Sequence, residues 1–285
     1  MSESITVRPM RHDDIAFALT QTEREGWDIA EDGFEMHLRH DPDGCFVAAA
    51  DGAPIGMVTT TRFGDAGFVG NLIVEPAFRR HGIGEALMRR ALRRLQDHGA
   101  RRIELEADAP GVRLYRRLGF VDRFESLRFR RQRRAEPAVT RRTNGRPITA
   151  DDLGLISHLD RFCFGADRAR LLAALIERSP GSYWVGDPDE PAGYVITQRL
   201  TGALRVGPCV ARDADLFADL LEAILSRHDA PWYKLALPAE NTAGVELLRR
   251  RGFEETTSSR RMMLGEGGYH DRPRQIFAIA GGDRG

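Results

Sequence analysis

The chain has 285 residues, enough for one large domain or two of ordinary size, each able to bury a core. Its formal net charge is zero and 29% of its residues are charged, so no overall field attracts it to nucleic acid or an acidic membrane. Three cysteines without metal-ligand spacing predict neither a metal site nor a disulfide framework. There is no signal segment and no run of about 18 apolar residues, so we expect a cytoplasmic protein.

The first half of the chain reads as strands alternating with helices. Asp13 and Asp14 precede an apolar periodic run and predict a helix start, and Asp51 and Gly52 predict a turn between two strands. A strand ending at Val74 leads into a basic glycine-rich loop and a long amphipathic helix. Residues between 21 and 44 are predicted to form short helices and loops. The predicted strands cover 5–8, 45–50, 55–61, 69–74, 102–107 and 120–130, and a short helix covers 110–118.

Residues 132–146 are rich in arginine, proline and glycine and have no amphipathic period, which predicts a linker. We interpret their arginines as a solvated connector rather than a nucleic-acid patch, because no aromatic residues are interleaved with them. After this linker the sequence repeats itself. The segment at Gly193 resembles the one at Gly56, 137 positions earlier, and the segment at Gly252 resembles the one at Gly119, 133 positions earlier.

The difference between these two offsets means that the second copy is about four residues shorter at the glycine-rich loop. In place of that loop it has residues 211–215, which include Asp213 and Asp215. Two carboxylates would repel a phosphate group rather than bind it. We therefore expect the second copy to keep the fold and to lack the ligand.

The loop of the first copy, Arg79–Gly84, predicts phosphate binding. Gly82 and Gly84 have no Cβ, so a ligand can approach the backbone closely. The helix that follows offers free N–H groups and a partial positive charge at its start. The alternative interpretation is a tight turn with incidental arginines.

Two motifs give this sequence a resemblance to a known family. Arg79, Gly82 and Gly84 match the pattern Arg or Gln, two residues, Gly, one residue, Gly or Ala, and Tyr115 stands four residues before a Gly-Phe pair at Gly119. Over residues 5–130 the chain thus resembles the GNAT superfamily of N-acetyltransferases. The second half resembles the GNAT-like C-terminal domain of some bacterial members.

The resemblance implies an α/β (α+β) fold with two tandem GNAT-like domains, each a mixed twisted sheet flanked by helices. We expect a catalytic domain at 1–131, the linker at 132–146 and a degenerate domain at 147–285. The second domain would wall the acceptor cleft or form the surface of a homodimer.

The resemblance also implies acetyl-CoA as the cosubstrate, without a metal. Backbone N–H groups of the loop would hold the pyrophosphate, and the end of the preceding strand would pair with the pantetheine amides like an added strand. His81 alone in this loop is more typical of a polar surface residue than of a catalytic one. The expected cofactor-binding residues are Leu72, Ile73, Val74, Arg79, Arg80, His81, Gly82, Ile83, Gly84 and Glu85.

Tyr115 is the expected general acid. A phenol with an ordinary pKa near 10 can protonate a CoA thiolate, whose pKa is roughly 8 to 9, as it leaves. The alternative is a half-buried helical tyrosine that packs beside Leu114 and Leu118. The second copy has Leu248 at the equivalent position, so it lacks the acid as well as the loop.

No general base is evident. The resemblance places one at Phe68 or Gly70, and neither side chain can accept a proton. The proton could pass through water, or to Glu104, Glu106 or Asp108, which share one face of the following strand. The competing interpretation of these three residues is a solvated acidic face.

An acidic stretch around Trp27 falls where the family usually builds its acceptor site. Trp27, Asp28 and Glu106 would suit a cationic amine through charge attraction and cation–π contact, although a solvated helix face explains the charges equally well. We expect an acetyl-CoA-dependent N-acetyltransferase that acts on a small-molecule primary amine by direct attack in a ternary complex, with no nucleic-acid or membrane partner. The alternatives are a non-catalytic acetyl-CoA sensor and a protein or peptide N-acetyltransferase.

Overall fold

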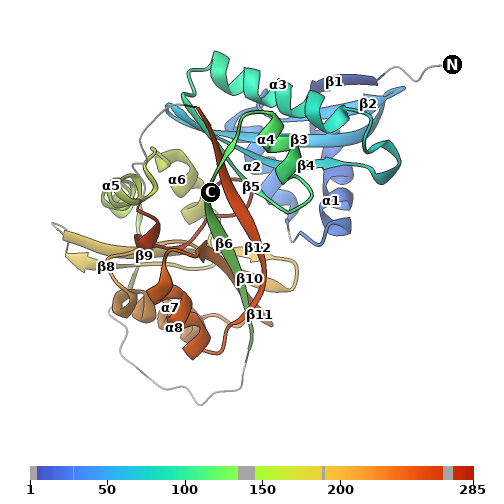
Figure 1. Ribbon diagram of the computed structural model, residues 1–285. Helices are drawn as coiled ribbons and strands as arrows, with labels where there is room; N and C mark the ends of the chain where they lie inside the picture. Colours follow the sequence, from blue (N-terminus) through green and yellow to red (C-terminus); the bar gives the residue numbers. More distant parts are fainter. Residues whose placement is uncertain (1–4, 28, 134–144, 188–189, 266–271) are drawn as a thin grey trace. The chain divides into compact units, whose positions relative to one another are not determined.

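The computed structural model describes residues 5–27, 29–133, 145–187, 190–265 and 272–285 (Figure 1). The chain divides into two compact units. In each of them a mixed, twisted sheet is flanked by helices, which confirms the fold class expected from the sequence. Unit 1 consists of Met1–Asp122, Met262–Gly267 and Gly282–Gly285, and unit 2 of Arg123–Arg261 and Gly268–Gly281.

Unit 1 is built from the first five strands and the first four helices. Their bounds are β1 Ile5–Pro9, α1 Ile15–Arg24, α2 Glu31–His40, β2 Phe46–Ala50, β3 Ala53–Phe63, β4 Ala66–Val74, α3 Ile83–Asp97, β5 Arg102–Ala107 and α4 Val112–Arg117. The strand order is β1-β2-β3-β4-β5, antiparallel except for the parallel pair β4–β5. Helix α3 covers one face of this sheet, and α1 and α2 cover the other (Figure 1).

The core of unit 1 lies on both faces of the sheet. Leu87 and Met88 of α3 are fully buried against sheet residues that include Val69. On the opposite face, Phe34 of α2 packs in a cluster with Ile73 of β4. Burial of each such side chain contributes roughly 1.5–3 kcal/mol, so the start of α3 and the end of β4 are held firmly in place.

Unit 2 contains the remaining elements, except for the first two residues of β6 and the end of β12. Their bounds are β6 Val121–Gln132, β7 Arg146–Pro147, α5 Leu153–Phe164, α6 Ala169–Arg178, β8 Ser182–Asp187, β9 Glu190–Leu200, β10 Ala203–Ala211, α7 Ala214–Arg227, β11 Trp232–Pro238, α8 Thr242–Arg250, β12 Glu254–Gly265 and β13 Ile276–Ala278. The strand order is β6-β11-β10-β9-β8-β7, with β13 paired to β10. Helices α7 and α8 lie on one face of this sheet and α5 and α6 on the other (Figure 1).

The two units repeat one strand register. In unit 1, Val69 pairs with Thr60 and Ile73 pairs with Met57 across β4 and β3. In unit 2 both pairs recur 137 positions later, across β10 and β9. The internal repeat inferred from the sequence is therefore a repeat of structure.

The units are bounded differently from the domains expected at 1–131 and 147–285. Strand β6, the last of the first repeat, pairs with β11 from Ser126 to Gln132 and so belongs mainly to unit 2. Strand β12, the last of the second repeat, ends in unit 1, where Met262 lies in the core with α3. Residues 134–144 of the predicted linker lie outside the described residues.

Candidate active site

Strands β4 and β5 of unit 1 part from one another halfway along their length. Their parallel pairing ends at Val69 and Leu105. Just beyond, Asn71 has a φ of 51° and the register with β3 shifts, while the Asn71 side chain donates a hydrogen bond of 3.1 Å to Thr59 Oγ1. Along the described chain, only β3 and β5 pair with β4, so the edge at Leu72–Val74 that faces β5 has no strand partner.

The loop after β4 ends in a helix start that no side chain caps. Arg80 and Gly82 have φ values of 68° and 78°, and α3 begins at Ile83 with Gly82 as its N-cap. A Cβ on Gly82 would meet no atom within 4 Å, so the positive φ alone favours glycine there. The first N–H groups of an α-helix have no partner inside the helix, and here no side-chain cap supplies one. Arg80, His81 and Gly82 are exposed, and the loop can therefore present N–H donors to an anion.

Arg79, the first residue of the motif, has a structural function in this loop. Its Nε donates a hydrogen bond of 2.8 Å to the Val74 carbonyl oxygen, and its guanidinium group forms an ion pair with Glu25. These contacts tie the loop to the ends of β4 and α1. At the other end of the loop, hydrogen bonding from Arg89 lowers the pKa of Glu85.

Tyr115 is buried, with 8% of its surface exposed. A Cβ on Gly111 would lie 2.7 Å from its ring, and Phe120 packs edge-on to it with centroids 6.0 Å apart. Burial, and to a lesser degree the charge of Asp108, raise the pKa of Tyr115 well above 10. The expectation of an ordinary pKa is therefore wrong, because the sequence does not reveal this burial. At neutral pH the phenol keeps its proton, so it can supply a proton but cannot serve as a base.

The acidic side chains of β5 do not form one solvated face. Glu104 is buried, with 4% exposure, and forms a 3.0 Å ion pair with Arg102. Glu106 and Asp108 are half-buried. Trp27 packs against the cluster beneath α1 and α2, and Asp28 lies outside the described residues. The solvated interpretation is thus wrong for Glu104.

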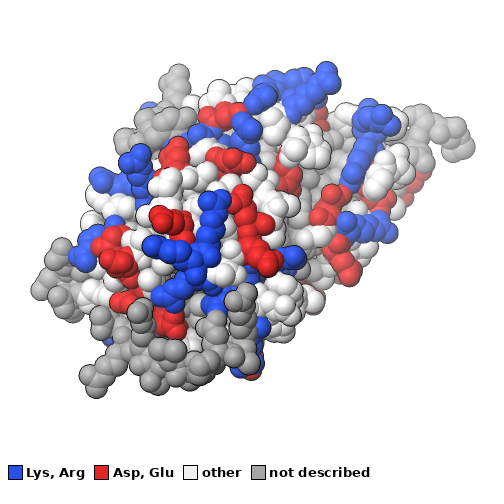
Figure 2. All heavy atoms as spheres, turned by 60° about the horizontal axis from the view of Figure 1, so that its bottom comes forward, with Lys and Arg blue, Asp and Glu red and all other residues white. Residues whose placement is uncertain are grey.

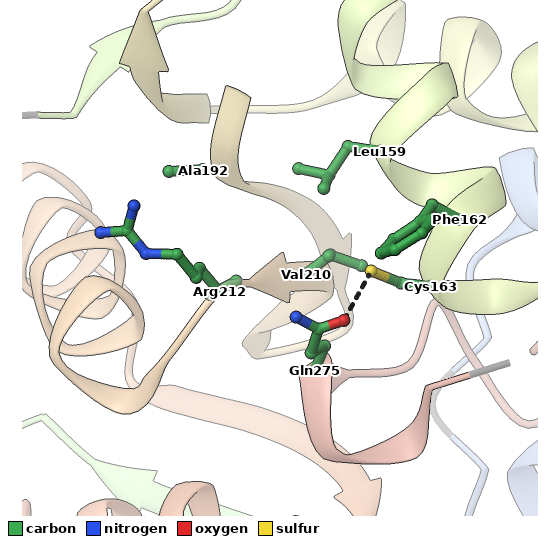
Figure 3. A pocket seen from close by; sticks show the side chains of 8 residues that line it. Leu159, Phe162, Cys163, Ala192, Val210, Arg212 and Gln275 are labelled. Atoms are coloured by element: carbon green, nitrogen blue, oxygen red, sulfur yellow. Dashed lines mark hydrogen bonds between the residues drawn. The ribbon is translucent and has the colours of Figure 1, made fainter. Parts of the chain in front are cut away.

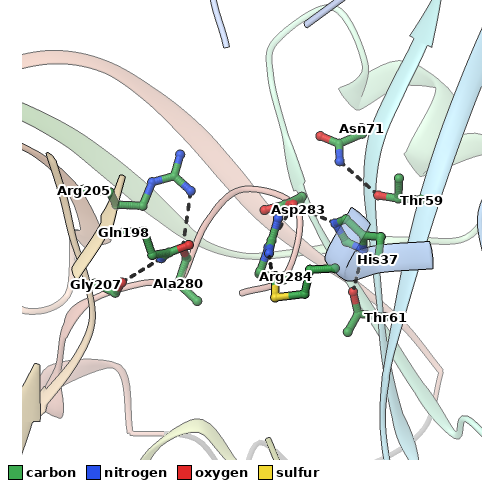
Figure 4. A network of polar contacts seen from close by, with 11 residues as sticks. His37, Thr59, Thr61, Asn71, Gln198, Arg205, Gly207, Ala280, Asp283 and Arg284 are labelled. Carbon is green, nitrogen blue, oxygen red and sulfur yellow. Dashed lines mark hydrogen bonds and ion pairs between the residues drawn. The ribbon is translucent and has the colours of Figure 1, made fainter. Parts of the chain in front are cut away.

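A short segment near the end of the printed sequence lies where the base is missing. Phe68 is buried, and a Cβ on Gly70 would stand 2.5 Å from the Cα atom of Asp283. Asp283 Oδ2 lies 2.8 Å from His37 Nε2, and His37 Nδ1 lies 3.4 Å from Thr61 Oγ1 (Figure 4). Sequence reasoning missed these residues because His37 and Asp283 are 246 positions apart and belong to no local motif.

The charge states in this cluster follow from its burial and its ion pairs. Burial alone would raise the pKa of Asp283, but the charge of Arg284 and the hydrogen bond with His37 hold it well below its usual range. Burial and the charge of Arg284 lower the pKa of His37, against the opposing effect of Asp283. At neutral pH Asp283 is therefore a carboxylate and His37 a neutral imidazole.

Unit 2 closes the corresponding gap with its own backbone. Cys209 and Val210, 137 positions after Leu72 and Ile73, pair with residues of β13. The N–H group of Ile279 donates a 2.8 Å hydrogen bond to a carbonyl oxygen of β11, so residues 276–279 contact both β10 and β11. The strand edge that has no strand partner in unit 1 along the described chain is therefore occupied in unit 2.

Helix α7 also differs from its counterpart α3. Its N-cap residue is Asp213, whose carboxylate accepts a hydrogen bond of 2.9 Å from the Leu216 N–H group. The carboxylate both satisfies a donor and places a negative charge at the helix start. Leu248 is buried at the position equivalent to Tyr115. Unit 2 therefore has a carboxylate at the start of its helix and an apolar side chain in place of Tyr115.

One cavity of about 160 Å³ lies in unit 2 at the end of β10 (Figure 3). This volume is below that of pockets for drug-sized ligands, roughly 300–1,000 Å³. Burial raises the pKa of its Cys163 thiol to about 12, so the thiol is protonated at neutral pH. The cavity is lined by Leu159, Phe162, Cys163, Ala192, Val210, Ala211, Arg212 and Gln275.

Three further features concern the described part of the chain. Its His, Cys, Asp and Glu side chains form no group of three that could hold a metal ion. Its helices are all too short or too polar to cross a membrane. Figure 2 shows basic and acidic side chains lying beside one another on the face in view.

Comparisons with known proteins agree with this geometry. Residues 10–120 match the model of the GNAT acetyltransferase family, and residues 156–278 match a second GNAT acetyltransferase domain model. The uncharacterized N-acetyltransferase YitH of Bacillus subtilis is 25% identical over 68% of this chain and 68% of its own length. Acetyltransferase SG1711 of Sodalis glossinidius is 34% identical over 35% of this chain and 72% of its own length.

The fold has a solved counterpart as well. A crystal structure from Pyrococcus horikoshii matches with a TM-score of 0.85 at 24% identity, covering 99% of this chain and 96% of that one. Fold, site and relatives together define an acyltransferase. The chain belongs to the GNAT family of acetyltransferases and carries two GNAT domains in tandem. Members of this family generally use acetyl-CoA.

Proposed function

We propose that unit 1 transfers an acetyl group from acetyl-CoA to the primary amine of a small molecule, by direct attack in a ternary complex. The observation that carries this proposal is the contrast between the two repeats. Among the described residues, no strand pairs with the β4 edge and no side chain caps α3 in unit 1, whereas unit 2 fills the first with β13 and caps the second with Asp213. Unit 2 would then serve as a cofactor-free relative.

The residues of unit 1 suit the chemical groups of acetyl-CoA, which supplies an activated thioester. Backbone N–H groups of Arg80–Glu85 would hold the pyrophosphate at the uncapped helix start. Main-chain groups of Leu72–Val74 would pair with the pantetheine amides as an added strand does. Arg79 would act indirectly, because its contacts with Val74 and Glu25 fix the shape of the loop.

Tyr115 would protonate the departing sulfur. Its raised pKa keeps the phenol protonated at neutral pH, so the donor form is always present before the reaction. Its burial beside Gly111 and Phe120 limits the positions that its hydroxyl group can reach. Proton donation by a positioned side chain is worth roughly 100- to 10,000-fold in rate.

A small acceptor is supported over a peptide by the packing of unit 1. Asp283 lies against Gly70 of β4 so closely that a Cβ would not fit between them. A peptide backbone laid along β4 at that point would collide with the segment. The cytoplasmic location, the absence of nucleic-acid and membrane partners and the homodimer remain predictions.

The test is a thiol-release assay with acetyl-CoA and a panel of amino acids, polyamines, aminoglycosides and peptides. With the best acceptor, Tyr115→Phe should lower kcat about 100-fold while acetyl-CoA affinity changes less than about twofold. Tyr233→Phe is the matched control, because it removes a phenol of unit 2 that donates to the His228 carbonyl group. Unchanged turnover in Tyr115→Phe would reject the acid. Tight acetyl-CoA binding without any acceptor would favour the sensor.

A further inference from the structure

The segment Gly282–Gly285 adds a buried polar cluster to unit 1 that the reaction described above does not use. Asp283 and Arg284 are 4% and 3% exposed, although both are charged. Arg284 pairs with Asp283, and its Nη1 contacts the sulfur of Met36 on α2. His37, the next residue of α2, joins Asp283 on one side and Thr61 of β3 on the other (Figure 4).

The protonation states define the direction of the hydrogen bonds in this cluster. The Asp283 carboxylate can only accept, so His37 Nε2 must carry the hydrogen and donate it. A neutral imidazole with its hydrogen on Nε2 has none on Nδ1, which can then accept from the Thr61 hydroxyl group. The Thr60 backbone also hydrogen-bonds to the ring and favours the other tautomer, so the two tautomers are compared by measurement below. The order is therefore Thr61 to His37 to Asp283. A hydroxyl group, an imidazole and a buried carboxylate in this order also form the proton-transfer unit of serine hydrolases.

The cluster lies at the point of β4 where the strand itself offers no base. Thr61 pairs directly with Phe68 in the sheet, and Thr59 pairs with Gly70. Paired residues of neighbouring strands project on the same face, so the Thr61 side chain shares the face of Phe68 and Gly70. Thr61 is half-buried, whereas His37 is fully enclosed. Thr61 is thus the more exposed end of the cluster.

We propose that Thr61 receives the proton of the acceptor amine and passes its own proton to His37, which Asp283 holds in the required tautomer. This inference rests on the proposed function. Thr61 is the catalytic residue, because it meets the amine. His37 and Asp283 are positioning residues that act through it. Thr61 and His37 thereby take the place of the base that β4 lacks, and a segment distant in the sequence holds His37 in position.

The proton transfers balance within one turnover. As the amine nitrogen bonds to the thioester carbonyl carbon, its proton moves to Thr61 Oγ1 and the Thr61 proton moves to His37 Nδ1. The carbon–sulfur bond breaks, its electron pair leaves with sulfur, and sulfur takes the proton of Tyr115. The extra proton on His37 and the one missing from Tyr115 then exchange with water. The 3.4 Å contact between Thr61 and His37 is long, as such contacts often are before substrate binds.

A purely structural interpretation makes different predictions. If Asp283 and His37 only anchor the segment, the stability of unit 1 depends on them but the Thr61 hydroxyl group has no effect on kcat. The substitutions must therefore distinguish the packing of each side chain from its ability to transfer a proton. Thr61→Val keeps the shape without the hydroxyl group, and Thr61→Ser keeps the hydroxyl group. His37→Gln keeps an N–H donor for Asp283 and removes the proton acceptor.

The first measurement needs no acceptor. Nitrogen chemical shifts of labelled histidine report which ring nitrogen carries the hydrogen, and the His37 signal is the one lost in His37→Gln. At neutral pH the full chain should show His37 with hydrogen on Nε2 alone. Asp283→Asn should change that pattern, because an amide can donate to Nε2. Hydrogen on Nδ1 in the unaltered protein would overturn the proposal.

The second measurement is steady-state kinetics with the best amine of the panel. Thr61→Val and His37→Gln should each lower kcat about 100-fold, with KM for acetyl-CoA unchanged, and Thr61→Ser should stay within about threefold of the unaltered protein. Asp14→Asn is the matched control for Asp283→Asn, because Asp14 is also a buried carboxylate of unit 1 paired with an arginine. It should leave kcat unchanged while Asp283→Asn lowers it.

The outcomes distinguish the two levels of the argument. An unaltered protein that acetylates an amine while Thr61→Val turns over at the same rate overturns the proton relay alone. An equal loss in Thr61→Ser and Thr61→Val also overturns it, because the hydroxyl group would then be irrelevant. An unaltered protein that binds acetyl-CoA and acetylates no amine overturns the proposed function, and the relay with it.

Discussion

The two units share one strand register, yet they satisfy the main chain at the ligand gap in different ways. In unit 2, β13 pairs with β10, and the carboxylate of Asp213 accepts from the first turn of α7. In unit 1, the equivalent edge of β4 has no strand partner along the described chain, and α3 begins at Gly82 without a side-chain cap. Equivalent backbone donors and acceptors are thus paired within the chain in unit 2, whereas in unit 1 we expect a ligand to pair with them.

The comparison shows that one fold can satisfy equivalent main-chain groups in two ways. Buried main-chain groups must find a partner, and a strand of the chain itself can replace the amides of a cosubstrate. Gly70 of unit 1 and Gly207 of unit 2 lie at these two equivalent positions. A Cβ on Gly207 would meet the Ile279 carbonyl oxygen at 2.4 Å, as one on Gly70 would meet Asp283. The same segment of chain therefore passes over equivalent glycines in the two units.

Removing the side chain that anchors β13 should give the largest effect on stability. Phe277 is 1% exposed, and its ring centroid lies 4.7 Å from that of Phe217 on α7. Phe277→Ala should lower the free energy of unfolding of unit 2 by about 4 kcal/mol, because it leaves a cavity and loosens β13. Urea unfolding followed by fluorescence and circular dichroism measures it. Phe162→Ala, at a side chain with 49% exposure, should cost less than about 1 kcal/mol.

Much of this fold could be predicted from the sequence, because its signals are local. Alternating apolar residues and turn residues located β5 at Arg102–Ala107 as observed, and the repeat offset of 137 recurs in the strand pairs. The partners of the last strands could not be predicted. Strands β6 and β12 have similar patterns, and nothing in either sequence says which sheet it joins.

The same division between local and distant signals applies to the site. The loop at Gly82 follows from a local motif, and its positive φ and uncapped helix fit the phosphate interpretation. Burial raises the pKa of Tyr115, and the core cluster that holds Tyr115 includes residues as distant in the sequence as Phe46 and Met262, so the local sequence predicts an ordinary value. The cluster of His37 and Asp283 has no local signature at all, since its members meet only in the folded unit.

The equivalent glycines offer a direct comparison of the two gaps. Gly207→Ala should destabilise unit 2 by about 3 kcal/mol, because the Cβ meets a backbone oxygen and the φ of 149° is unfavourable for alanine. Gly70→Ala should destabilise unit 1 by about 2 kcal/mol, since only the steric term applies. Differential scanning calorimetry can measure both. Gly84→Ala is the control, because its Cβ would make ordinary contacts at 3.7 Å and stability should be unchanged. A larger loss in Gly70→Ala than in Gly207→Ala would contradict the comparison.

The cap of α7 should contribute less. Asp213→Ala removes the acceptor of the Leu216 N–H group and should lower the stability of unit 2 by about 1 kcal/mol. Asp213→Asn retains an oxygen in the same place and should lose only a few tenths, which urea unfolding can resolve. Equal losses in both variants would mean that the charge at the helix start, rather than the hydrogen bond, distinguishes α7 from the uncapped α3.

The last prediction concerns a cap that both units share. The hydrogen bond from Arg146 lowers the pKa of Asp152 to about 2 from 3.8, as Arg8 helps to lower that of Asp14 in unit 1. A folded pKa below the unfolded one gives stability that is present above about pH 4 and is lost as pH falls toward 2. Because Arg146 is half exposed, solvent screens the pair and the loss should be about 1 kcal/mol. Urea unfolding from pH 5 to 2 should show this loss in the unaltered protein and a flatter curve in Asp152→Asn. Asp14→Asn should flatten the curve of unit 1 instead, and identical curves for all three proteins would reject the shared role of these carboxylates.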